Sequence, residues 1–110
     1  MGQYHKLYNR TKKEYVAGHD IDNGLKLLEQ IGWGGSTSTA LWLLVANSNG
    51  RGGGDALPHP MIGHWAGDSI VVQGDYAKKT DPAFISEKEI ETYTNISEQV
   101  KEMLDAQDRL

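Results

Sequence analysis

The chain has 110 residues, 38% of them hydrophobic, with no cysteine and a formal net charge of −4 at pH 7. We expect one domain over residues 1–110, because this length supports one hydrophobic core and the large apolar side chains exclude disorder as the main state. Without cysteine there is no disulfide, no thiolate metal site and no cysteine nucleophile.

Several classes of protein are excluded by simple patterns. The longest apolar run, residues 40–46, is far shorter than the roughly 20 residues that a helix needs to cross a bilayer, so we expect no membrane partner. The first residues lack the basic and then apolar pattern of a secretion signal, which favours a cytoplasmic protein. Residues 81–110 carry eight acidic side chains and the chain has no basic stripe, so we expect no duplex nucleic acid partner.

The first part of the chain predicts a hairpin followed by two helices. Alternating side chains indicate strands at residues 4–8 and 13–17, joined by a polar turn. Asp20 or Asp22 can cap a helix that runs to Ile31, since apolar residues there recur at helical spacing. A second helix, from about Ser36 to Ala46, is apolar on nearly every side, which is typical of a central, buried helix.

The second part predicts a long loop, a second hairpin and a helical end. Residues 47–60 have no periodicity, whereas residues 61–65 and 69–73 look like strands around a turn at 66–68. The consecutive apolar residues 70–72 favour a strand that is covered on both faces. Capping pairs at Ser86 and at Asn95 begin a short helix and the last helix. The predicted fold is α+β, a single compact domain with a mainly antiparallel sheet and about three packed helices, one of them central and buried.

Two glycine-rich segments could bind an anion. The first, before the second helix, would offer backbone N–H groups at a positive helix end; the second follows that helix and contains a lone arginine that could contact a phosphate in two places. Neither has the spacing of a Walker loop or of a dinucleotide-binding fingerprint. The candidate ligand-binding residues are Gly34, Gly35, Ser36 and Thr37 in the first segment, and Asn49, Arg51, Gly52, Gly53, Gly54 and Asp55 in the second.

Aromatic residues further along the chain could complete such a site. Trp65 or Tyr76 could stack on the base of a nucleotide, and Asp68 lies three residues after Trp65. We add these three residues to the candidate ligand-binding set.

A metal site is an alternative use of the same region. His59 and His64 are candidate metal ligands, and Asp68 and Asp75 could add carboxylate oxygens. Their spacing matches no zinc-protease helix, and no Gly-x-Ser-x-Gly motif marks a serine nucleophile.

Four short sequence blocks give the chain a family resemblance. They are Gly2-Gln3-Tyr4, Gly24-Leu25-Lys26-Leu27-Leu28-Glu29, Asn49-Gly50-Arg51-Gly52-Gly53-Gly54-Asp55 and Trp65-Ala66-Gly67-Asp68. In this order the blocks resemble a family of short bacterial and phage proteins. The resemblance groups the chain without implying an activity.

Three hypotheses follow. The first is a non-catalytic binding protein for an anionic, phosphate-bearing ligand of the nucleotide type, without a further cofactor; in a phage it could sequester a nucleotide immune signal. The second is a homo-oligomeric protein-interaction module, in which the apolar helix contacts a partner. The third is a metal-dependent hydrolase that uses His59, His64, Asp68 and Asp75. The absence of a catalytic motif favours binding over catalysis.

Overall fold

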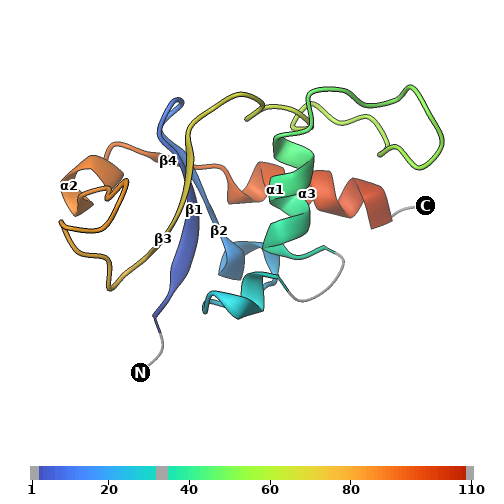
Figure 1. Cartoon of the computed structure of the whole chain (residues 1–110). Helices are drawn as coiled ribbons and strands as arrows, with labels where there is room; N and C mark the ends of the chain where they lie inside the picture. The colour runs from blue at the N-terminus through green and yellow to red at the C-terminus, as the bar shows by residue number, and fades with distance from the viewer. Residues whose placement is uncertain (1–2, 32–34, 109–110) are drawn as a thin grey trace.

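One four-stranded sheet organises the chain (Figure 1), and the computed structural model describes residues 3–31 and 35–108. The strand order is β3-β1-β2-β4, in which β2 and β4 are parallel and the other pairs antiparallel. The α+β prediction, with a mainly antiparallel sheet and about three helices, is confirmed. The strands are β1 (His5–Asn9), β2 (Glu14–Ala17), β3 (Ile70–Gly74) and β4 (Thr94–Asn95). The helices are α1 (Thr37–Leu44), α2 (Glu87–Ile90) and α3 (Ser97–Asp108), with 3-10 turns η1 (Gly18–Ile21) and η2 (Leu28–Gln30).

The predicted first hairpin is confirmed as β1 and β2. Its register pairs Lys6 with Ala17 and Asn9 with Glu14. The buried Asn9 side chain fixes the turn, because its Oδ1 accepts the Lys12 backbone N–H at 2.8 Å. An Asn that bonds the backbone three residues ahead is a common way to close such a turn.

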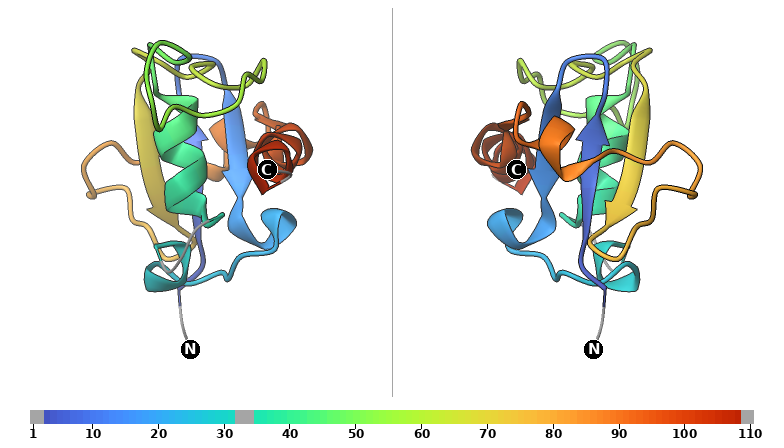
Figure 2. Two further views of the ribbon diagram at one scale, coloured as in Figure 1. Left: turned by 90° about the vertical axis from the view of Figure 1, so that its right-hand side faces the viewer. Right: turned by 90° about the vertical axis from the view of Figure 1, so that its left-hand side faces the viewer.

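The two faces of the sheet are covered differently. Helices α1 and α3 pack on one face, and α2 lies on the other (Figure 1). Figure 2 shows α1 on the β3 side of the sheet and α3 on the β2 side. The α3 face holds the main core, and the α2 face holds a smaller cluster around Tyr8, Ile85 and Tyr93.

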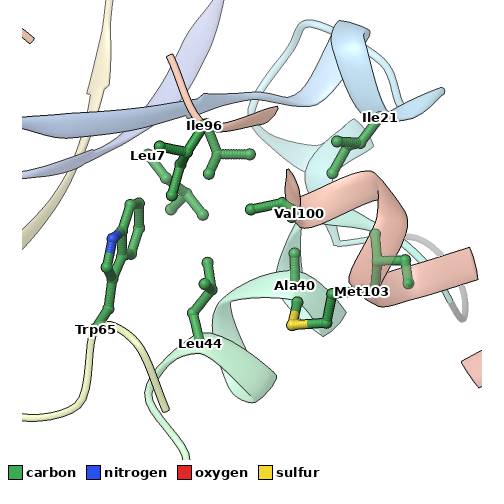
Figure 3. Packing of buried hydrophobic residues seen from close by; sticks show 10 residues of the cluster. Leu7, Ile21, Ala40, Leu44, Trp65, Ile96, Val100 and Met103 are labelled. Atoms are coloured by element: carbon green, nitrogen blue, oxygen red, sulfur yellow. The ribbon is translucent and has the colours of Figure 1, made fainter. Parts of the chain in front are cut away.

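Trp65 is the largest fully buried side chain (Figure 3). It has no exposed surface, and its indole N–H donates to Glu14 Oε1 at 2.9 Å. A buried indole N–H needs an acceptor, so this bond lets the ring enter the core beside Leu7 and Leu44.

The predicted strand at residues 61–65 is wrong, because this segment is a series of turns. The backbone N–H groups of Gly63 and Trp65 donate to the carbonyls of Leu43 and Leu44, at 2.9 and 2.8 Å. The last carbonyls of a helix lack partners within it, and here the turns supply them. Accordingly β3 pairs with β1 and not with residues 61–65.

The predicted helix from Asp20 to Ile31 is also wrong, because two short 3-10 turns lie in this segment. The chain forms η1 and η2, and between them the Leu25 carbonyl accepts the His5 N–H at 2.8 Å. Glu29 Oε1 accepts the N–H groups of Leu25 and Lys26, at 3.0 and 2.9 Å. Bonds to the sheet and to a side chain thus take the place of helical bonds in this segment.

Two predictions of burial need correction. Helix α1 buries Thr37, Ala40 and Leu44, but Trp42 is 79% exposed, so this helix is not covered on every side. Strand β3 is not covered on both faces either, because Val72 is 47% exposed.

The contrast between buried and exposed aromatic residues can be tested by denaturation. Trp65→Phe removes the donor to Glu14 and part of the ring volume, so we expect it to lower the free energy of unfolding by about 2 kcal/mol. Tyr76→Ala, at a half-exposed aromatic residue, should change it by no more than about 0.5 kcal/mol. Urea titrations followed by circular dichroism measure both, and similar losses would contradict this placement of Trp65.

Candidate functional site

The hydroxyl groups at the start of α1 make hydrogen bonds within the protein. Ser36 Oγ accepts the Thr39 N–H at 3.4 Å and lies 2.7 Å from Ser38 Oγ. The buried Thr37 hydroxyl donates to Gln30 Oε1 at 2.6 Å and accepts from Asn23 Nδ2 at 3.0 Å. Both candidate hydroxyls therefore have internal partners. Of the glycines, Gly35 has a positive φ of 82°, and Gly34 lies outside the described residues.

The arginine-containing loop is closed by its own side chains. The Asn49 side chain donates to the Ala56 carbonyl and accepts the Ala56 N–H, at 3.0 and 2.9 Å. Asp55 Oδ2 accepts the N–H groups of Arg51 and Gly52 at 2.8 and 3.2 Å. These are two of the backbone N–H groups that we expected to bind a ligand, and a carboxylate of the chain itself binds them instead. These bonds hold the pKa of Asp55 below its usual value. The neighbouring Gly53 and Gly54 are exposed.

The other candidate residues lie in different places. Trp65 is enclosed in the core, so its ring has no exposed face for a ligand. Asp68 lies at the Asn9 end of β1, where its Oδ2 accepts from Asn9 Nδ2 at 2.8 Å and from Lys12 Nζ at 2.5 Å. Tyr76 is 55% exposed and follows the opposite end of β3. The predicted residues therefore do not meet in one site.

The residues of the metal alternative are also separate. Asp75 donates its backbone N–H to the Tyr4 carbonyl, at the end of β3 remote from Asp68. His59 Nδ1 accepts the Met61 N–H at 3.1 Å, and His64 Nε2 lies 2.9 Å from Glu14 Oε1. Within residues 3–31 and 35–108, no three histidine or acidic side chains are grouped so that they could hold a metal ion.

A cavity that the sequence did not reveal lies on the α2 face of the sheet. It has a volume of about 800 Å³ and is bounded by β1, β3 and the chain from Asp75 to Ile90. Tyr8 and Ile85 are its most buried hydrophobic lining residues, at 7% and 1% exposure. Three lysines also line it: Lys6, Lys78 and Lys79.

An apolar surface lies on the opposite face, beside α1. A groove of about 140 Å³ there is lined by residues from β1, α1, β3 and the segment around η2, and the surface that they present to it is almost entirely apolar. Around it and along α1 several large hydrophobic side chains are exposed. They are Leu27 (46%), Leu28 (77%), Ile31 (59%), Trp42 (79%), Val45 (37%) and Val72 (47%), and we call this set the α1 apolar surface.

No protein-family model, curated protein or solved structure matches the chain. The resemblance to short bacterial and phage proteins therefore stays a prediction from four sequence blocks. In the described part of the chain, no helix has the length and apolar character needed to cross a membrane. The two surfaces described above are the features from which a function can be argued.

The contacts of Asp68 give a pH prediction. Hydrogen bonds from Lys12 and then Asn9 hold the pKa of Asp68 below its usual value, so the folded state favours its carboxylate. The resulting stabilisation is present above the unfolded-state pKa of about 3.9 and is lost as the pH falls through the lower folded-state pKa. We expect Lys12→Met to raise the Asp68 pKa toward its usual value.

Carbon-13 NMR titration of the aspartate carboxyl carbons measures this change. The matched variant Lys13→Met removes one charge from the same turn but not a bond to Asp68, so it should leave that pKa unchanged. Equal shifts in the two variants would contradict a specific Lys12–Asp68 interaction.

Proposed function

We propose that the chain is a protein-interaction module whose partner is a second copy of itself, bound through the α1 apolar surface and the free edge of β3. The observation that carries the proposal is the exposure of Trp42. Monomeric proteins seldom expose several large apolar side chains together, and tryptophan is among the residues that contribute most to interfaces.

The exposed Trp42 shares one flank of α1 with two partly buried residues and with the exposed Val45, which follows the helix. Ser38, Leu41, Trp42 and Val45 are spaced as i, i+3, i+4 and i+7, which places them along one side of a helix. Ser38 and Leu41 also line the groove, together with Val72 of β3. The flank therefore continues from the helix to the edge of the sheet.

The hydrogen-bond pattern leaves the outer edge of β3 open. Arg10 N–H donates to the Ser69 carbonyl, and Asp75 N–H donates to the Tyr4 carbonyl. The backbone groups of successive residues in a strand point in opposite directions. In β3 the N–H and C=O groups of the odd-numbered residues therefore point to β1, and those of Ile70 and Val72 point to the open edge. No other described strand pairs with this edge.

The chemistry of this edge suits a second copy. Neither α1 nor β3 contains a charged residue or a proline, which are common protections against edge pairing. Two acidic chains can approach through the uncharged α1 and β3 with little repulsion. Antiparallel pairing of β3 with its counterpart about a two-fold axis would extend the sheet and place both α1 helices on the same face.

Substitution of Trp42 tests the interface. We expect the wild type to be a dimer and Trp42→Ala to shift the equilibrium to monomer, weakening association by about tenfold or more because a central tryptophan contact is lost. Tyr76→Ala, at an exposed aromatic residue outside this surface, should leave association unchanged. Sedimentation velocity over a concentration series measures all three proteins. A monomeric wild type at high micromolar concentration would overturn the proposal.

Hydrogen exchange tests the strand pairing separately. The Val72 N–H points to the open edge, so its exchange should slow as the protein concentration rises and the dimer forms. The Val71 N–H, which points toward β1, should be protected at every concentration. If the Val72 exchange rate does not depend on concentration in a dimeric sample, β3 does not pair across the interface.

A further inference from the structure

The cavity on the α2 face combines aromatic walls with a positive rim. Its volume of about 800 Å³ is within the range of small-molecule sites. Tyr4, 42% exposed, and the half-buried Phe84 contribute rings to its lining, and Tyr8 and Ile85 are its most buried side chains. A flat apolar group could therefore contact rings and aliphatic carbon here.

The lysines of the cavity have few partners within the described residues, and Lys6 Nζ lies over the Tyr15 ring at 5.3 Å from its centre. Among the described residues, no ion pair involves Lys6, Lys78 or Lys79. Two acidic residues, Asp75 and Glu87, also line the cavity, so its lining has a surplus of positive charge in a chain whose net charge is −4. Local positive charge on an acidic protein attracts small anions.

Hydrogen bonds hold the cavity walls in place. The Gln73 side chain donates to the Ile85 carbonyl and accepts the Ile85 N–H, at 2.7 and 2.8 Å, which fastens the wall to β3. The Asp81 side chain accepts the Lys78 N–H at 2.8 Å, and the Asp81 N–H donates back to the Lys78 carbonyl. This turn fixes the backbone that carries Lys78 and Lys79.

The phenol of Tyr8 adds a neutral donor to the lining. Burial, with smaller contributions from Tyr15 and Asp75, raises the pKa of Tyr8 above its usual value. Like an ordinary tyrosine hydroxyl, the Tyr8 hydroxyl is protonated at neutral pH and can donate a hydrogen bond.

From this geometry we infer that the cavity binds a small organic anion with a planar ring and a phosphate group, of the nucleoside monophosphate class. The phosphate contacts the lysines, and the ring lies against Tyr4 and Phe84.

This site differs from the two glycine-rich segments. In the first segment the hydroxyls of Ser36 and Thr37 have internal partners, and in the second segment Asp55 accepts the backbone N–H groups that a ligand would need. It also lies on the face of the sheet opposite to the apolar groove, because Tyr8 and Gln73 line the cavity whereas their strand neighbours Leu7 and Val72 line the groove.

Calorimetric titration with AMP, adenosine and inorganic phosphate tests the inference. We expect AMP to bind more tightly than either fragment, because only AMP contacts both the rings and the lysines. Lys79→Gln should weaken AMP binding by about tenfold, the usual effect of losing one charged hydrogen bond. Lys13→Gln makes the same charge change in the turn between β1 and β2, and should leave AMP binding unchanged.

Three results would overturn the inference. The first is no AMP binding at millimolar concentration, and the second is equal weakening by Lys79→Gln and Lys13→Gln. The third is inorganic phosphate binding as tightly as AMP, which would contradict the role of the rings. Trp42→Ala should retain AMP binding, so a failure of self-association and a failure of ligand binding are distinguishable.

Discussion

The loops of this protein depend on one kind of interaction. In it, a side-chain amide pairs with both the N–H and the C=O group of a residue elsewhere in the chain. An amide carries one acceptor and two donors, so it can replace a short piece of β-strand. Regular elements are few and short here, and backbone groups in the long connections need partners. Three such pairs hold two connections. Gln73 with Ile85 holds the chain between β3 and α2, whereas Asn49 with Ala56 and Gln107 with Leu57 hold the chain between α1 and β3.

The same long segments explain why prediction from sequence succeeded only in part. The first hairpin, α1, α3 and the Ser86 cap depend on neighbours in the chain, so periodicity and capping residues were sufficient to predict them. The helix expected at residues 20–31 and the strand expected at 61–65 fail because their partners are distant. His5 bonds the first of these segments, and the end of α1 bonds the second.

The candidate site was missed for a related reason. A glycine-rich segment shows which amides are accessible, but not which nearby carboxylate will bind them, and Asp55 does so here. The lysines of the cavity come from β1 and from the chain after β3, so no spacing in the sequence connects Lys6 with Lys78. Only the antiparallel pairing of β1 with β3 brings them to one cavity.

Strand β3 joins the two surfaces that carry the proposals. Successive residues of a strand point to opposite faces, so Val72 lines the apolar groove while Gln73 fastens the cavity wall. A partner that pairs with the edge of β3 orders the backbone of both residues. If this ordering changes the affinity of the cavity for its ligand, the ligand must change the affinity between the two copies by the same factor, because coupling between sites is reciprocal. The short β3 strand is therefore the place where self-association and ligand binding can influence one another.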